Sequence, residues 1–560
     1  MYQRIFKAFI LIFALVITSG NATAQRKSKK NNAVETKDPI NTTPKLVVGI
    51  VVDQMRYDYL TRFWNHYENG GFKRMVNEGF NCKNNHYNYA PTNTGPGHTS
   101  VYTGTTPATH GVISNNWYDK ATGTSVYCAS DDSYNSVGTT SDAGKMSPHR
   151  MQTTTITDEL RLHTQMRGKT IAIAIKDRGA VLPGGHTANA AYWFDGNTAG
   201  NWITSTYYMN ELPKWVADFN SEKSVAKYKK PWTTLKPINT YVESVMDNNA
   251  YEGLFKGETA PTFPHDFPKL WEENGSYDIL KSSPYGNSLT TDFALAAVDG
   301  EGLGADAIPD FLAVSYSSTD YAGHKFGVDS KEIQDTYIQL DRDLARLFSA
   351  LDKKVGVGEY TVFLSADHAA NPVPAYLKDK KVLTTIFDRK VMLEELNEYV
   401  KFTYGTTDLI KNISNNQIFL DHDVVKNLDM NLKDVQENLA AEILGYKAID
   451  HVYTAYQMWQ NDYTRGIPHL IQNGYNEKRS GDVIYVQKPN TMSYSSTGSS
   501  HGSPYIYDTH TPLLFFGKGI KNGSTVARTE IPDIAATMAA LLGISFPSGT
   551  TGKPIVEVLD

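Results

Sequence analysis

The chain has 560 residues, of which 40% are hydrophobic and 11% aromatic, and its formal net charge is −6. This composition is typical of a well-packed globular protein and excludes a chain that is disordered over its whole length. A modest excess of acidic residues gives no electrostatic footprint for nucleic acid, so no nucleic-acid partner is expected.

The N-terminus has the three parts of a secretory signal peptide. Arg4 and Lys7 are basic, residues 8–17 (AFILIFALVI) are apolar, and residues 22–24 (Ala-Thr-Ala) form a small-residue cleavage site. The apolar run is about half of the roughly 20 residues that a membrane-spanning helix needs. We therefore predict a signal peptide over residues 1–24, no membrane anchor, and a periplasmic or secreted protein. A buried N-terminal helix is the alternative.

Five apolar runs predict the strands of a central sheet. In chain order they cover residues 46–53, 170–176, 310–316, 360–367 and 512–519. Continuous apolar runs are typical of strands that are buried on both faces, as in a parallel sheet. Between the third and fourth runs, residues 331–354 carry apolar side chains at the spacing of an amphipathic helix. Strands that alternate with helices predict an α/β fold with a mostly parallel sheet.

The mature chain is predicted to begin with a flexible polar leader, residues 25–43, and to continue as one catalytic domain over residues 44–560. Two segments of that domain differ in composition from the apolar runs. Residues 182–275 are rich in Tyr, Trp, Asn and Gly, and residues 385–495 include a helical stretch at 432–444. We expect both segments to be insertions that decorate the sheet.

The chain contains only two cysteines, Cys82 and Cys128. In an exported protein, two cysteines most simply form one disulfide, and a free reactive thiol is the alternative. A zinc site made of cysteines is excluded by their number.

Seven residues with metal-binding or nucleophilic side chains are spread along the chain, most of them at or just after a predicted strand end. They are Asp53, Thr94, Asp320, His324, Asp367, His368 and His501. Sites in open α/β sheets form beyond the carboxyl ends of the strands. Three carboxylates, three imidazoles and one hydroxyl suit two Zn²⁺ ions with a nucleophile between them, which predicts a metallohydrolase acting on phosphate esters. Taken singly, each residue also has a plain structural role, such as a turn residue or a surface loop histidine.

Thr94 lies in the motif Asn-Thr-Gly-Pro-Gly-His-Thr-Ser, residues 93–100, which predicts a tight turn leading into a helix. The N-terminus of a helix attracts anions through its free N–H groups and its dipole. A threonine hydroxyl activated there by a metal would be a nucleophile facing a phosphate. A plain helix N-cap is the alternative.

Two cations and one amide are candidates for binding a phosphoryl group. In the predicted strand TIAIAIKDRG, a period of two residues places Lys176 and Arg178 on the same side. Two cations at the end of a buried strand require an anion, and a phosphoryl group suits both side chains. A solvated strand end is the alternative. The amide of Asn115 could donate to a phosphoryl oxygen.

The order of these motifs resembles that of the alkaline phosphatase superfamily. The motifs are the strand that ends at Asp53, N-T-G-P-G-H-T, D-x-x-x-H at 320–324, S-A-D-H at 365–368 and S-S-H-G at 499–502. The segments V-V-D-Q-M-R, K-D-R and Y-D-T-H-T-P-L-L-F-F-G-K-G resemble specifically the PafA-type bacterial alkaline phosphatases. This resemblance covers nearly all of the mature chain and implies a three-layer α/β/α sandwich.

The resemblance also implies roles for the site residues. One Zn²⁺ would be held by Asp320, His324 and His501, and the other by Asp53, Asp367, His368 and the Thr94 oxygen. Thr94 would form a phosphothreonine intermediate, and Asn115, Lys176 and Arg178 would bind the phosphoryl oxygens. In this type, Lys176 takes the place of a third ion, so no Mg²⁺ requirement is expected.

The substrate class that we expect is a broad range of phosphate monoesters, with weaker activity on diesters. Lys176 and Arg178 favour the monoester because it carries more anionic charge at the transferred group. A sulfatase is not expected, since no arginine follows Thr94 in the sulfatase pattern. The alternatives are a diesterase like the nucleotide pyrophosphatase/phosphodiesterases, or a non-catalytic protein that binds phosphate or metal on the same scaffold.

Overall fold

The computed structural model describes residues 43–560 apart from 198–199 and 493–496. The predicted signal peptide and all but the last residue of the predicted leader lie outside these described residues. Within the described ranges, no helix has both the length and the apolar character that crossing a bilayer requires.

A ten-stranded sheet forms the centre of the fold, in the order β18-β2-β17-β10-β1-β9-β6-β7-β8-β5. Its five central strands are parallel: β10 (Tyr360–Ser365), β1 (Leu46–Val52), β9 (Asp310–Tyr316), β6 (Thr170–Ala174) and β7 (Ala190–Asp195). The flanking strands are β17 (Leu513–Gly517), β2 (Phe80–His86), β18 (Gly523–Glu530), β8 (Asn201–Ser205) and β5 (Ser136–Val137). The mostly parallel sheet is therefore confirmed, but the predicted strand at 512–519 pairs antiparallel with β10.

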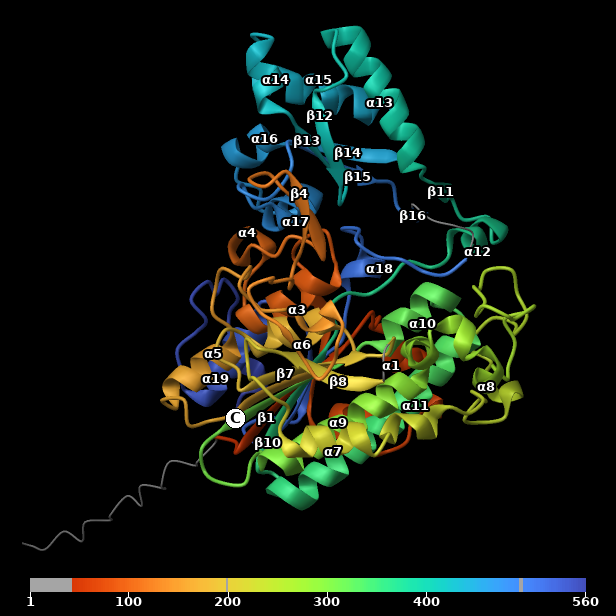
Figure 1. Cartoon of the computed structure of the whole chain (residues 1–560), viewed down its shortest axis with the longest axis vertical. Coiled ribbons are helices and arrows are strands. Elements are labelled where there is room, and N and C mark those ends of the chain that lie inside the picture. The colour runs from red at the N-terminus through yellow and green to blue at the C-terminus, as the bar shows by residue number, and fades with distance from the viewer. Residues whose placement is uncertain (1–42, 198–199, 493–496) are drawn as a thin grey trace, which may run out of the picture. The chain divides into compact units, whose positions relative to one another are not determined.

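Helices cover both faces of this sheet (Figure 1). On one face lie α3 (Thr94–Thr103), α5 (Ile156–His163), α6 (Asp177–Gly184) and α19 (Asp533–Leu542). On the other lie α7 (Lys214–Ser221), α9 (Pro284–Glu301) and α11 (Lys331–Leu351). β1 shows why both faces are apolar, because Val47 and Val51 pack into one core while Val48 and Ile50 pack into the other. The expected three-layer sandwich is confirmed.

A second, smaller sheet lies in the segment that we call the cap, residues 385–492. Its strands run in the order β12 (Ile410–Ser414), β13 (Gln417–Leu420), β15 (Val483–Gln487) and β14 (Ile449–Thr454), and every pair is antiparallel. α13 (Arg389–Tyr404), α14 (His422–Asn427) and α15 (Leu432–Leu444) pack on it around a core of their own (Figure 1).

Residues 182–275, the first predicted insertion, include part of the main sheet. β7 and β8 fall inside that range and belong to the main sheet. These two strands were not predicted because their Tyr, Trp and Asn content resembles that of the loops around them.

The predicted disulfide is absent, since Cys82 and Cys128 are both buried free thiols. Cys82 is fixed on β2, opposite Thr525 of β18. Cys128 follows β4 (Thr124–Tyr127) and packs against the first turn of α3, where a Cβ added to Gly95 would lie 3.2 Å from its sulfur. Different elements hold the two thiols, and the even count of cysteines could not reveal this.

Candidate active site

The carboxyl ends of three adjacent strands bring together the predicted metal ligands. Asp53 directly follows β1, Asp367 lies two residues after β10, and α10 (Ser318–Phe326), which follows β9, carries Asp320 and His324. Because β10, β1 and β9 are parallel neighbours, these residues meet at one edge of the sheet. All three carboxylates are buried, whereas the side chain of His324 is 40% exposed and opens the cluster to solvent.

Two glycine positions allow α3 to approach this edge closely. A Cβ on Gly49 of β1 would lie 2.5 Å from the hydroxyl of Tyr102, and a Cβ on Gly97 would lie 2.2 Å from the carbonyl oxygen of Asp367. Only glycine permits such contacts, so the last turn of α3 lies directly on β1 and its first turn lies directly on the segment that follows β10. Asn93 is the N-cap of this helix, and the hydroxyl of Thr94, its first residue, is left to face the cluster.

The hydroxyl oxygen of Thr94 lies 3.4 Å from Nε2 of His368 and 3.5 Å from Nζ of Lys176. Thr94 is buried and occupies the first turn of α3, where the peptide N–H groups favour negative charge. The structure therefore places a hydroxyl between an imidazole and an ammonium group at a helix N-terminus.

Each of the three predicted histidine ligands is oriented by a backbone carbonyl. Nδ1 lies 2.8 Å from the Ser499 oxygen in His324, 3.0 Å from the Ala369 oxygen in His368 and 2.7 Å from the Thr92 oxygen in His501. A carbonyl only accepts, so each Nδ1 donates, and in the neutral imidazole the lone pair is then on Nε2. This arrangement is typical of histidines that bind a metal through Nε2.

Buried acceptor atoms face one another with no donor between them. Oδ1 of Asp53 and Oδ2 of Asp367 accept no hydrogen bond from the described residues. Each of these oxygens lies 3.5 Å from Nε2 of His368. Lone pairs that meet in this way in a buried site need a cation among them, so the donor set fits a metal.

Two groups of side chains have their ligand atoms within 4.8 Å of one another. They are Asp320, His324 and His501, and Asp53, Asp320 and His368. The first group is the one that the sequence predicts. The second contains Asp320 where the sequence predicts Asp367, although Asp367 still contacts His368. The rings of His368 and His501 stack at 3.5 Å between centroids and join the two groups.

Burial and neighbouring charges shift the pKa values of Asp53 and Asp320 in opposite directions. Burial, with the charge of Asp367, raises the pKa of Asp53 well above its usual range. Burial acts in the same direction on Asp320, but His324 and Lys176 outweigh it and hold the pKa of Asp320 well below its usual range.

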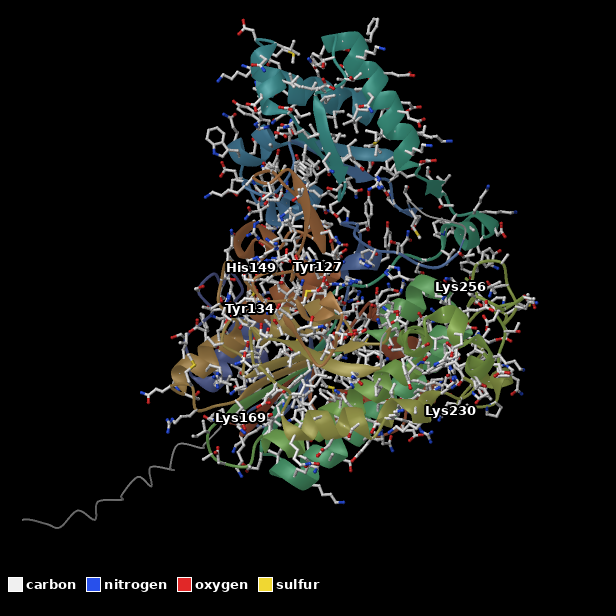
Figure 2. All side chains as sticks on the ribbon, viewed as in Figure 1. Tyr127, Tyr134, His149, Lys169, Lys230 and Lys256 are labelled. Carbon is white, nitrogen blue, oxygen red and sulfur yellow. The ribbon has the colours of Figure 1, made fainter. Side chains whose placement is uncertain are left out.

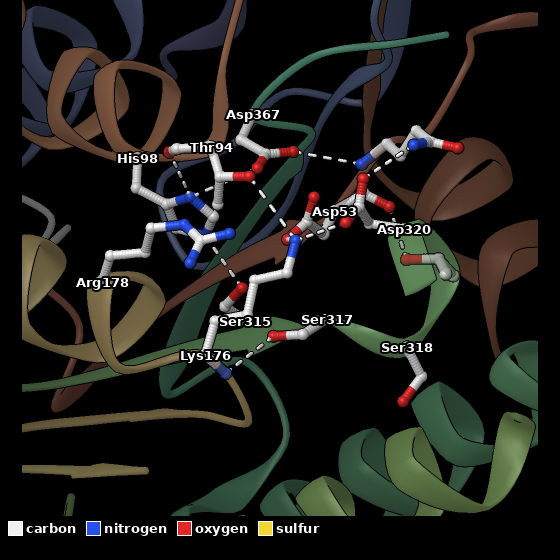
Figure 3. Close-up of polar contacts among 12 residues, drawn as sticks. Asp53, Thr94, His98, Lys176, Arg178, Ser315, Ser317, Ser318, Asp320 and Asp367 are labelled. Carbon is white, nitrogen blue, oxygen red and sulfur yellow. Dashed lines mark hydrogen bonds and ion pairs between the residues drawn. The ribbon is translucent and has the colours of Figure 1, made fainter. Parts of the chain in front are cut away.

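Lys176 does not lie on a strand, and here the sequence prediction was wrong. β6 ends at Ala174, and Lys176 is the N-cap of α6. Its ammonium group lies 2.7 Å from Oδ2 of Asp53 and 2.5 Å from Oδ2 of Asp320 (Figure 3). The buried cation that was predicted is present, and its partners in this structure are carboxylates.

Arg178 lies in the first turn of α6, so the period of two residues that linked it to Lys176 does not apply. Its Nη1 donates to the hydroxyl of Tyr127 at 3.1 Å. Tyr127, which is labelled in Figure 2, is the last residue of β4. Its Nε is buried and has no partner in the described part of the chain. A buried guanidinium N–H without an acceptor is available to an anion.

Asn115 contacts the first turn of α3, the helix that begins at Thr94. Its Oδ1 accepts from the backbone N–H of Gly95 at 2.7 Å, which fixes the orientation of the amide. The amide NH₂ group therefore points away from that contact, and it has no acceptor among the described residues.

Sequence reasoning missed two residues that support the cluster. Gln54 donates from its backbone to Asp367 at 3.1 Å and from its amide to Asp320 at 2.7 Å. His98 lies 2.9 Å from the Thr94 carbonyl oxygen and 3.4 Å from Oδ2 of Asp367 (Figure 3). Gln54 adopts φ +66°, a conformation that its sequence context did not signal. The position of His98 four residues after Thr94 was the one available hint.

Residues 47–512 match the model of the family described as type I phosphodiesterase / nucleotide pyrophosphatase. The chain belongs to this family. It is 44% identical to alkaline phosphatase PafA of Elizabethkingia meningoseptica, over 98% of both chains. It is 47% identical to a Myroides odoratus protein named calcium-transporting ATPase, over 92% of this chain and 95% of the relative. The resemblance to PafA-type alkaline phosphatases expected from the sequence is confirmed.

The fold matches solved structures of the same type. A crystal structure of a PafA variant, in which a threonine, an asparagine, a lysine and an arginine are substituted, superposes with a TM-score of 0.89 at 44% identity. The match covers 92% of this chain and 99% of the other.

Proposed function

We propose that the chain is an exported, zinc-dependent alkaline phosphatase that hydrolyses a broad range of phosphate monoesters through a phosphothreonine on Thr94. The observation that carries this proposal is the hydroxyl of Thr94, which lies at a helix N-terminus 3.4 Å from His368 and 3.5 Å from Lys176. The names of the PafA relatives support the activity. Export is proposed from the predicted signal peptide.

Two Zn²⁺ ions fit the donor atoms described above. Asp320, His324 and His501 would hold one ion, and Asp53, Asp367, His368 and the Thr94 oxygen would hold the other. When bound, the ions supply Lewis acidity that lowers the pKa of the Thr94 hydroxyl and neutralises charge on the phosphoryl group. The three backbone carbonyls that orient the histidines keep each Nε2 available for this role.

In the first step, the Thr94 oxygen forms a bond to phosphorus and the bond from phosphorus to the leaving oxygen breaks. The proton of the Thr94 hydroxyl leaves, and the departing alcohol gains one. In the second step, water breaks the bond between Thr94 and phosphorus, which releases phosphate and restores the hydroxyl. The N–H groups at the start of α3 stabilise the negative charge throughout.

Three side chains bind the transferred phosphoryl group in this proposal. The amide NH₂ of Asn115 and Nε of Arg178 are donors without acceptors among the described residues. Lys176 adds a charge beside the Thr94 oxygen. The substituted residues of the PafA variant, threonine, asparagine, lysine and arginine, are of the same types as Thr94, Asn115, Lys176 and Arg178.

A diesterase is the second candidate, because the matching family is described as phosphodiesterase and nucleotide pyrophosphatase. The metal-binding groups and Thr94 would serve either substrate. Lys176 and Arg178 favour the monoester, since its additional negative charge lies on the group that they face. Weaker diesterase activity is therefore part of the proposal.

Covalent trapping tests the proposed function. The zinc-loaded protein is mixed with an aryl phosphate, quenched in acid, and digested for mass spectrometry. We expect a phosphate group on Thr94 in the wild type. In Thr94→Ser, the phosphate group should again be on the side chain at position 94. Rapid turnover with no phosphorylated residue at position 94 would overturn the nucleophile assignment. ATP, suggested by the name of the Myroides relative, is a further substrate for the same experiment.

A further inference from the structure

A hairpin of the cap reaches the site through one side chain. Asn415 and Asn416 form the two-residue turn between β12 and β13, with φ values of +53° and +58°. Two left-handed residues in succession are the requirement of a tight hairpin turn, and asparagine tolerates this conformation. The backbone N–H of Tyr485 donates to the Asn416 carbonyl at 3.0 Å, so β15 holds the turn in place.

The amide of Asn415 binds both neighbours of Asn115. Its Nδ2 donates to the carbonyl oxygen of Asn116 at 2.6 Å, and its Oδ1 accepts from the hydroxyl of Ser114 at 2.8 Å. Asn115 lies between these two contacts. The backbone segment that presents the Asn115 amide is therefore clamped from outside by a residue about 300 positions away in the chain.

The same contacts continue to the nucleophile's helix. The Ser114 hydroxyl accepts from Nδ2 of Asn93 at 3.1 Å, and Asn93 is the N-cap directly before Thr94. On the inner side, Asn115 itself accepts from the N–H of Gly95. The segments that carry the nucleophile and the amide are thus joined twice, by the contact of Gly95 with Asn115 and by that of Asn93 with Ser114. Asn415 orients the Ser114 hydroxyl that makes the second contact.

Residues of this hydrogen-bonded chain also line a cavity. Asn93, Asn415 and His501 line a space of about 970 Å³ bounded by the cap and by the edge that carries the metal-binding groups. That volume is in the range of small-molecule sites. A substrate bound there would contact the cap and His501 at once.

We propose that Asn415 is a positioning residue for phosphoryl transfer, which fixes the Asn115 amide relative to Thr94. The inference rests on the proposed function, because it assumes that the Asn115 amide donates to the phosphoryl group. Asn415 does not contact that group itself; it acts through Ser114 and Asn116.

Asn415→Gly tests the proposal, because glycine keeps the left-handed turn and removes both side-chain contacts. Asn416→Gly is the matched control: it makes the same backbone change at the adjacent position, where the side chain contacts Gln487 at 3.5 Å. We expect kcat/KM for an aryl phosphate to fall about tenfold in Asn415→Gly. In Asn416→Gly we expect it to stay within about twofold of the wild type.

A double-mutant cycle separates positioning from a general structural effect. In an Asn115→Ala background the amide is already gone, so adding Asn415→Gly should cause little further loss in kcat/KM. An unchanged kcat/KM in Asn415→Gly alone would overturn the proposal. So would an equal loss in both backgrounds, because Asn415 would then act independently of Asn115. If the wild type fails to hydrolyse aryl phosphates at all, it is the proposed function that fails.

Discussion

Replacing Lys176 by alanine tests whether its charge serves the phosphoryl group or only balances carboxylates. The ammonium group is buried between Asp53 and Asp320, and it lies 3.5 Å from the Thr94 oxygen. A phosphoryl group that reacts with this oxygen therefore brings its charge close to Nζ. Two bound zinc ions would still neutralise Asp53 and Asp320 in the variant, so we expect the zinc-loaded enzyme to stay folded.

The size of the effect follows from these distances. Unit charges about 4 Å apart interact by roughly 4 kcal/mol at an effective dielectric constant of about 20. A monoester carries one more negative charge than its methyl diester, shared over three oxygens, so about one third of that energy distinguishes the two. Lys176→Ala should therefore reduce kcat/KM for the monoester about tenfold more than for the diester.

The assay compares an aryl phosphate with its methyl diester on one zinc-loaded preparation, with zinc content measured for each protein. Lys214→Ala is the control, because the side chain of Lys214 is 87% exposed on α7 and is not among the residues of the site. It should leave both substrates unaffected. Equal losses on the two substrates in Lys176→Ala, at full zinc content, would refute the reasoning and leave Lys176 with a purely structural role.

Three further predictions concern the nucleophile, the metals and the thiols. Thr94→Ala should reduce monoester turnover to near background while zinc remains bound, and near-normal turnover would exclude Thr94 as the nucleophile. A chelator should abolish activity and Zn²⁺ should restore it, whereas stimulation by added Mg²⁺ would contradict the expectation, drawn from the sequence resemblance, that Lys176 takes the place of a third ion. Burial raises the pKa of Cys82 and of Cys128 to about 12, so both stay protonated at neutral pH and should react slowly with alkylating agents in the native protein. After unfolding without reductant, mass spectrometry should show two added alkyl groups, and an unchanged mass would indicate a disulfide.

The central strands β1, β6, β9 and β10, unlike β7, could be predicted because their apolar runs are a local feature of the sequence. Each of the runs that became β1, β9 and β10 is buried on both faces, and a predicted metal ligand follows its carboxyl end. The orientation of β17 could not be predicted in the same way. A continuous apolar run looks alike in a parallel and an antiparallel strand, and only the pairing with β10 reveals the direction.

Other features of the site depend on contacts between residues distant in the sequence. Lys176 and Arg178 were linked by a strand periodicity that does not extend past Ala174, because α6 begins at Asp177 with Lys176 as its N-cap. Gln54 was missed because its two contacts depend on a positive φ. The contact of Asn415 with Asn116 joins residues 299 positions apart, so nothing near either residue indicates it.

The measurement that tests the account most directly is kcat/KM of the wild-type, zinc-loaded protein for an aryl phosphate monoester and its methyl diester. The account predicts a monoester preference of several orders of magnitude, since Lys176 and Arg178 add charge where only the monoester can use it. A preference for the diester would contradict it. The metal-binding groups and Thr94 would then belong to a phosphodiesterase, and the two cations would have structural roles.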